Sequence, residues 1–200
     1  MANVYLMSWK DDGKKTGHGI FSKSDVSPAH ELTKELLSKD EFACDAHFRR
    51  IEIAKNGLVY SDSLPTDDVW KDYPANEFAF PLLSEGFMNL IKANTTSIDA
   101  IDFIKFPIQH FDQKRTYYIL RFNKLHDVID RKLTTYVKGT DHIIVPCFTA
   151  AAFDSIQIAS KPISHDLWRI TSGIYVSEKL KRKISQSKIK GIDFSKVRVS

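Results

Sequence analysis

Three of the seven histidines stand next to an aspartate, the combination that general acid–base catalysis uses. The pairs are His126-Asp127, Asp141-His142 and His165-Asp166. Neighbouring side chains diverge by about 100° on a helix and point to opposite faces of a strand, so adjacency alone does not bring an imidazole to its carboxylate. We expect surface or loop-anchoring histidines and assign no catalytic residue.

Phosphate, metal and thiol signatures are also incomplete. Gly13–Gly19 has the letters of a P-loop without its spacing, and paired aspartates such as Asp67-Asp68 lack the further oxygen ligands that a hard cation needs. Cys44 and Cys147 are far apart and in no CxxC pair, which predicts two reduced thiols. We expect no metal and no cofactor, and an enzyme with an unrecognised site stays as one rival interpretation.

Composition describes a chain that can bury its own core. The 200 residues are 42% apolar and 27% charged, which excludes disorder and fibres, and no apolar run reaches the ~20 residues that a bilayer requires. The net charge of +4 hides an asymmetry, because residues 1–100 carry 11 basic and 16 acidic side chains and residues 101–200 carry 18 and 9. The first residues have no basic leader, so we expect a cytoplasmic protein.

The N-terminal half contains two strong local signals. Ser27-Pro28 begins a predicted helix that runs to about Ser38, with Ser27 as cap and Pro28 at the first helical position. His47–Ala54 alternates apolar and polar residues, and Asn56-Gly57 after it is typical of a type I′ hairpin turn. Val4–Trp9 is expected to be the opening strand.

A weak repeat organises the remainder. Leu83-Ser-Glu85 and Val176-Ser-Glu178 each precede a helical pattern and then an apolar strand, over about 84–106 and 177–198. In both copies the serine is predicted to cap the helix and the glutamate to lie at the positive end of its dipole.

Further strands are predicted from β-branched and aromatic content, at Thr116–Phe122, His142–Phe148 and Asp166–Ile170. The elements together indicate an α+β fold: a mixed, largely antiparallel sheet with a few covering helices, in two close lobes related by the weak helix–strand repeat. An acidic portion, 1–79, and a basic portion, 80–200, are expected to pack as one globular unit.

One candidate partner surface is an acidic loop with two aromatic residues. Aromatic anchors inside a negative field suit a basic partner protein, but the aromatic side chains could equally fix the loop to the core. The residues are Asp67, Asp68, Trp70, Asp72, Tyr73 and Glu77.

A second candidate surface is the basic helix near the C-terminus. Its lysines and arginine could follow nucleic-acid phosphates, although no aromatic side chain lies among them to stack on bases, and a solvated helix face explains them as well. A nucleic-acid-binding or regulatory module is thus the alternative function. The residues are Lys179, Arg182, Lys183 and Lys190.

Several blocks resemble the immunity protein 11 family of bacterial polymorphic toxin systems, over about residues 80–198. The C-terminal blocks are Leu167–Ile170, Ile174–Lys181 and Ile189–Phe194, preceded in the same order by Leu83–Glu85 and Tyr117–Asp130. The resemblance implies a non-catalytic protein that binds a cognate toxin effector domain in the producing cell and blocks it. It supplies no catalytic residues, and it leaves the oligomeric state open.

Overall fold

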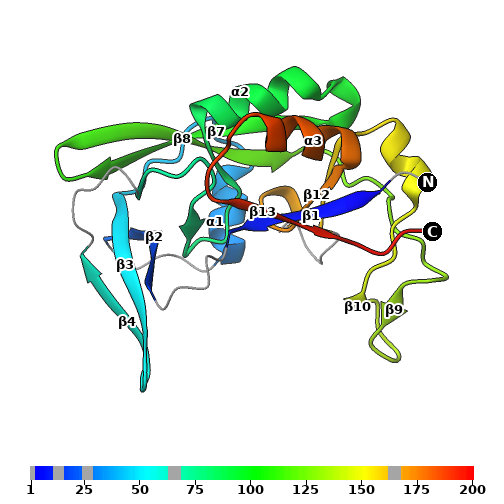
Figure 1. Cartoon of the computed structure of the whole chain (residues 1–200), viewed down its shortest axis with the longest axis horizontal. Coiled ribbons are helices and arrows are strands. Elements are labelled where there is room, and N and C mark those ends of the chain that lie inside the picture. The colour runs from blue at the N-terminus through cyan, green and yellow to red at the C-terminus, as the bar shows by residue number, and fades with distance from the viewer. Residues whose placement is uncertain (1–2, 11–15, 24–28, 63–68, 162–167) are drawn as a thin grey trace.

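The structure is a computed structural model that describes residues 3–10, 16–23, 29–62, 69–161 and 168–200. In these ranges the chain forms three sheets of three or four strands, a separate two-stranded hairpin and three α-helices (Figure 1). Antiparallel pairing dominates, with β2 and β5 as the parallel pair among the named strands. The predicted α+β class with mixed, largely antiparallel strands is confirmed.

The first strand of the chain completes a sheet built otherwise from the C-terminal half. Met7 of β1 lies opposite Ile174 on one side and Phe194 on the other. The acidic portion therefore contributes an internal strand to a sheet of the basic portion. The sheet has the order β11-β12-β1-β13, with β1 (Val4–Trp9), β11 (Ile158–Ser160), β12 (Ile174–Ser177) and β13 (Ile192–Lys196).

Both predicted serine caps are confirmed. Ser84 Oγ accepts a hydrogen bond of 3.2 Å from the amide of Phe87, and Ser177 Oγ accepts one of 3.1 Å from the amide of Leu180. Each cap ends a short strand and starts a helix, and another strand follows, as the repeat predicted. The elements are β6 (Leu82–Ser84), α2 (Glu85–Asn94), the 3₁₀ turn η2 (Ser97–Asp99) and β7 (Ile101–His110), and in the second copy β12, α3 (Glu178–Gln186) and β13.

The hairpin predicted in the N-terminal half is also confirmed. Ala54 pairs with Gly57, so the two turn residues are Lys55 and Asn56, one position earlier than predicted, and Gly57 enters the next strand at φ +124°. This hairpin belongs to a sheet of order β4-β3-β2-β5. Helix α1 (Ala29–Leu36) lies between β2 and β3 in the chain. The strands of the sheet are β2 (Thr16–Ser22), β3 (Ala46–Ala54), β4 (Gly57–Asp62) and β5 (Ala75–Asn76).

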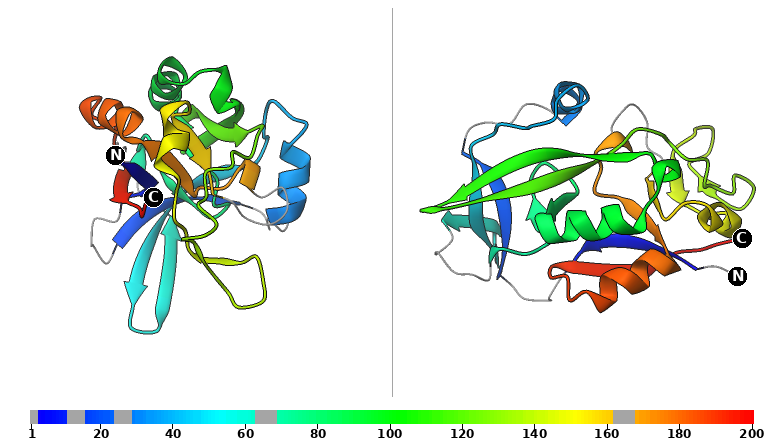
Figure 2. Two further views of the ribbon diagram at one scale, coloured as in Figure 1. Left: turned by 90° about the vertical axis from the view of Figure 1, so that its right-hand side faces the viewer. Right: turned by 90° about the horizontal axis from the view of Figure 1, so that it is seen from above.

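Three apolar clusters hold the sheets together. One lies between the β2–β3 sheet and the sheet of order β6-β8-β7, in which β8 is Gln113–Phe122. The second packs α2 and α3, which lie side by side, onto β1, β8 and β12, with Met7, Phe87 and Leu180 among its members (Figure 2). The third surrounds Phe148, whose ring centroid lies 4.2 Å from that of Tyr175.

Two strand predictions differ from the structure. Within His142–Phe148, regular pairing is limited to β10 (Ile143–Val145), which forms a two-stranded hairpin with β9 (Thr135–Tyr136). In Asp166–Ile170, the described Trp168 and Arg169 lie in a 3₁₀ turn, so the strand prediction is wrong there. Arg169 instead donates its guanidinium hydrogens to the Phe122 carbonyl and the Asn123 side chain, which ties the turn to the end of β8.

Candidate partner-binding surfaces

Two members of the acidic loop are core residues. Trp70 is 9% exposed and Tyr73 is 1% exposed. Tyr73 packs edge-on against Phe87 of α2, with ring centroids 6.0 Å apart, and burial raises the pKa of its phenol. Asp67 and Asp68 lie outside the described residues. The burial of the two aromatic side chains fits the interpretation in which they fix the loop to the core.

Trp70 makes ring contacts, a hydrogen bond and a cation–π contact with side chains inside the fold. Its ring stacks on Tyr117 at an interplanar angle of 17° and meets Phe48 edge-on at 5.0 Å. Its Nε1 donates a 2.8 Å hydrogen bond to Gln113 Oε1, and the Arg115 guanidinium lies 4.5 Å from the ring centroid. These contacts join the loop to β3 and β8.

The two carboxylates of this loop inside the described ranges have different surroundings. Asp72 is half-buried and accepts hydrogen bonds from Ser84 Oγ at 2.6 Å and from the amide of Lys190 at 2.8 Å. It therefore links the cap of α2 to the segment before β13. Glu77 is exposed and accepts a hydrogen bond from the amide of Ser22. Of the four described residues, Glu77 alone is an exposed side chain.

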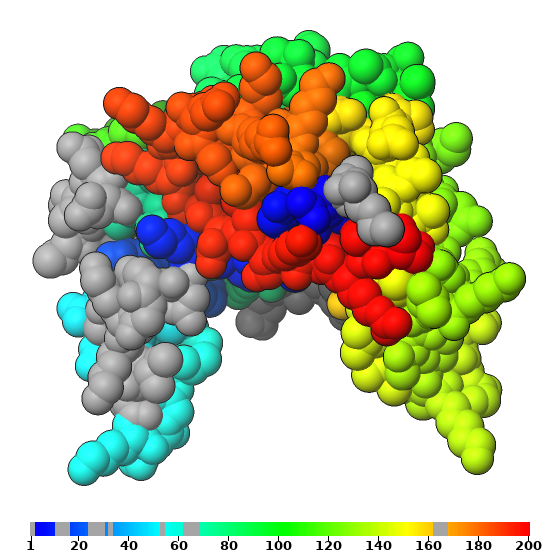
Figure 3. All heavy atoms as spheres, turned by 45° about the vertical axis from the view of Figure 1, so that its right-hand side comes forward, coloured from blue at the N-terminus to red at the C-terminus, as the bar shows by residue number. Residues whose placement is uncertain are grey.

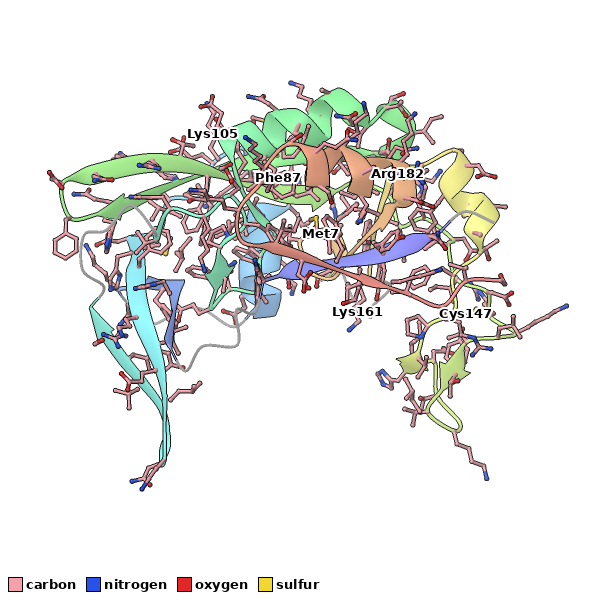
Figure 4. The ribbon with its side chains drawn as sticks, in the orientation of Figure 1. Met7, Phe87, Lys105, Cys147, Lys161 and Arg182 are labelled. Atoms are coloured by element: carbon pink, nitrogen blue, oxygen red, sulfur yellow. The ribbon has the colours of Figure 1, made fainter. Side chains whose placement is uncertain are left out.

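The basic face of α3 is exposed, as the sequence indicated. Lys179, Arg182 and Lys183 share one side of the helix by their spacing, and Arg182 pairs with Glu178 one turn away. Hydrogen bonds from Arg182 and Asn3 lower the pKa of Glu178. Lys190 is exposed in the loop before β13, outside the helix. Figure 4 shows Arg182 on the side of the molecule that carries both long helices.

The adjacent histidine–aspartate pairs in the described ranges are not arranged for proton transfer. His126 Nε2 lies 3.2 Å from the carbonyl of Asp99, whereas the carboxylate of Asp127 faces Arg131 at 3.8 Å. Asp141 and His142 are exposed, and the third pair, at 165–166, lies outside the described residues. Among the described residues no group of three or more His, Cys, Asp or Glu side chains could hold a metal ion.

An open pocket of about 590 Å³ lies beside α2 and β7. Its lining includes Asp102, Lys92 and Lys105. The carboxylate of Asp102 is already engaged by Arg121, through Nε at 2.7 Å and Nη2 at 2.6 Å. Burial acts to raise the pKa of Asp102, but hydrogen bonds from Arg121 and Asn123 outweigh burial, and the pKa is lowered. A carboxylate held ionised in this way is unsuited to donate a proton near neutral pH.

Two buried charged residues that the sequence did not single out are structural. Arg121 Nη1 donates to the carbonyls of Leu36, Leu37 and Lys39, so it closes the C-terminal end of α1. Asp99 is fully buried and accepts from the amides of Thr96, Gln157 and Ile158, which joins η2 to β11. Both side chains bind backbone groups that are distant from them in the sequence, so their roles depend on the tertiary structure.

Exposed apolar side chains gather on two projecting hairpins. Ten large apolar side chains of the described residues are exposed, and seven lie either on the β3–β4 projection (46–62) or on the β9–β10 projection (130–146). These seven are Leu58, Val59, Tyr60, Leu133, Val137, Ile144 and Val145. Both hairpins extend to the same side of the molecule, away from α2 and α3 (Figure 1). The surface is hollowed between them (Figure 3).

The order of apolar residues in the sequence contains a signal for the β3–β4 projection. A strand with one face on a core alternates apolar and polar residues, whereas Leu58, Val59 and Tyr60 are consecutive apolar residues immediately after a turn. In the structure the three are 56%, 52% and 42% exposed. Because consecutive side chains point to opposite faces, the hairpin presents apolar groups on both faces.

The family model of Immunity protein 43 matches residues 64–199. The chain belongs to this immunity protein family. The resemblance to the immunity protein 11 family therefore gave the right class of protein but a family number that the match does not support. The match starts at residue 64, so it includes much of the acidic loop as well as the basic portion. No curated protein matches the sequence.

Proposed function

We propose that this protein binds a cognate bacterial toxin effector domain and neutralises it by stoichiometric protein–protein inhibition in the cytoplasm of the producing cell. The observation that carries the proposal is membership of an immunity protein family, which implies a toxin as partner. The exposed apolar side chains on the two projections support a protein-binding role, since exposed apolar patches mark interaction sites.

A non-enzymatic mechanism fits the same observations. The described histidine–aspartate pairs have separate partners or are exposed, and Asp102 in the open pocket is paired with Arg121. Inhibition then depends on affinity, with interface anchors and electrostatic attraction as its determinants.

No helix in the described ranges has the length and apolar character needed to cross a bilayer.

Co-expression with a candidate toxin domain, taken from a gene that neighbours this one, tests the proposal. The chain is expected to restore growth of cells that produce the active toxin domain and to co-purify with it as a discrete complex. The matched comparison is an immunity protein from a different toxin pair, which should leave the cells unprotected. Failure of both protection and co-purification would contradict the proposed function.

The exposed basic face of α3 keeps one alternative open, a nucleic-acid-binding or regulatory module. Lys179 and Lys183 are one helical turn apart and face solvent. Phosphate contacts release counterions, so such binding weakens steeply as salt rises. A gel-shift titration with duplex DNA at low and at physiological salt separates the two functions, because an inhibitor of a protein should bind no DNA at physiological salt.

A further inference from the structure

Five of the seven exposed apolar residues on the two projections lie on the edge strands β4 and β10. β4 pairs with β3 alone among the described strands, and β10 pairs with β9 alone. Leu58 and Val59 on β4, and Ile144 and Val145 on β10, are 46–58% exposed. Edge strands of soluble proteins are usually protected by charges or bulges, because an apolar edge invites association. The β9–β10 pairing has such a bulge, a register shift between Ile143 and Val145, yet both edges leave apolar side chains exposed on the same side of the molecule. This exposure indicates contact with another protein.

The exposed area has the size that an interface needs. From their exposed fractions and the usual area of such side chains, the seven apolar residues leave roughly 600 Å² of surface open. A typical stable interface takes about 800 Å² from each partner. The two projections together, with part of the hollow between them, provide that area, whereas either projection alone provides about half of the apolar surface.

The two projections have a small net positive charge, which indicates the chemistry of the partner. The two projections together carry six Lys or Arg residues and four Asp or Glu residues. Lys161 adds a further positive charge, since it lies in the opening between the projections (Figure 4) and is exposed. Its backbone is fixed by a 2.7 Å hydrogen bond from its amide to the carbonyl of Gly173. A second copy of this chain would bring the same sign of charge, so a partner with carboxylates is favoured.

We propose that the β3–β4 and β9–β10 projections hold one toxin domain between them, against a face that combines apolar and acidic side chains. The proposal rests on the proposed function and names the surface that performs it. Contact at two separated sites also makes the orientation of the partner specific. The basic face of α3 is not part of this surface.

Threonine substitutions on each projection test the proposal. Leu58→Thr with Val59→Thr, and Ile144→Thr with Val145→Thr, remove apolar surface and keep strand-forming residues at exposed positions, where changes alter folding little. Each pair should weaken binding of the purified toxin domain at least about tenfold, and the four substitutions together about a hundredfold. Ile98→Thr is the matched control, because Ile98 is 55% exposed, close to the 58% of Ile144, but lies on η2.

A separate substitution tests the electrostatic part of the proposal. Lys161→Glu should slow association with the toxin domain several-fold at low salt, with a smaller effect at high salt. Lys105→Glu is the control, since Lys105 is also exposed but lies on the opposite side of the molecule (Figure 4). An equal effect of the two substitutions would overturn the assignment of charge to the hollow.

Three further outcomes distinguish an error in the proposed binding surface from an error in the proposed function. If the wild-type chain and the four-substitution variant bind the toxin domain equally, the surface is wrong while the proposed function stands. If the wild-type chain does not bind the toxin domain, the proposed function fails. If light scattering shows a wild-type dimer that the four substitutions convert to a monomer with toxin affinity unchanged, the projections bind a second copy and the proposal is overturned.

Discussion

Trp70→Ala distinguishes a core tryptophan from a partner anchor. The substitution removes a side chain that is 9% exposed and packed against Phe48 and Tyr117. Truncation of a buried aromatic side chain costs about 3–5 kcal/mol, because apolar surface is lost and a cavity remains. Loss of the Nε1 hydrogen bond to Gln113 and of the Arg115 contact adds about 1 kcal/mol. We expect the free energy of unfolding to fall by about 4–6 kcal/mol.

Urea denaturation followed by circular dichroism measures this loss, and a thermal melt should show a fall in Tm of roughly 10 °C. Trp70→Phe is the control, since it keeps most of the buried ring and should cost about 1–2 kcal/mol. A loss below 1 kcal/mol for Trp70→Ala, together with weakened toxin binding, would refute the reasoning. Trp70 would then act as a contact residue.

Three further predictions concern helix α3 and the partly exposed Arg121–Asp102 ion pair. Ser177→Ala should lower stability by about 1 kcal/mol in urea denaturation, because the Leu180 amide loses its acceptor; an unchanged midpoint would contradict the assigned cap. Asp102→Asn should cost about 2 kcal/mol at pH 7 by weakening two charged hydrogen bonds from Arg121. The folded pKa of Asp102 is lowered, so its contribution is present above its unfolded pKa of about 4 and is lost as pH falls through the folded pKa. The stability difference between wild type and Asp102→Asn should therefore shrink in acid, and a constant difference from pH 7 to pH 2 would refute the linkage. Lys179→Glu with Lys183→Glu should leave toxin neutralisation intact in the growth assay, and loss of protection would place α3 in the interface.

Signals confined to a short stretch of sequence predicted local structure well. Ser84 and Ser177 were identified as caps because the preference for serine before a helix arises within four residues of chain. The β3–β4 hairpin was found from Asn56-Gly57 and the alternation before it, which also depend on neighbouring residues. The α+β class followed from counting such elements.

Features that depend on distant residues could not be predicted in this way. β1 pairs with strands that begin at Ile174 and Ile192, and nothing in Val4–Trp9 specifies those partners. Ile144 illustrates the same difficulty for burial, since its segment has the composition of a buried strand but none of the described elements covers it, and it is 58% exposed. Apolar composition favours a strand, but only the tertiary arrangement decides whether something packs over it.

The candidate site shows this limit most clearly. Trp70 and Tyr73 in an acidic loop matched the description of interface anchors, yet both contact core residues brought from other elements. Part of the negative charge of residues 1–100 has a structural role, because Asp99 is buried and Asp72 is hydrogen-bonded within the fold. The proposed partner surface therefore rests on the exposed apolar groups of the projections and not on the charge of each half of the chain.

Titration of toxin activity with this protein tests the central claim most directly. A fixed concentration of the purified toxin domain, well above the dissociation constant, is mixed with increasing amounts of the wild-type chain, and the residual toxin activity is measured. We predict a linear fall that ends at a fixed equivalence point, close to one molecule per toxin domain, and a complex of that composition in light scattering. Complete inactivation by a small fraction of an equivalent, or no loss of activity at any ratio, would contradict neutralisation by stoichiometric binding.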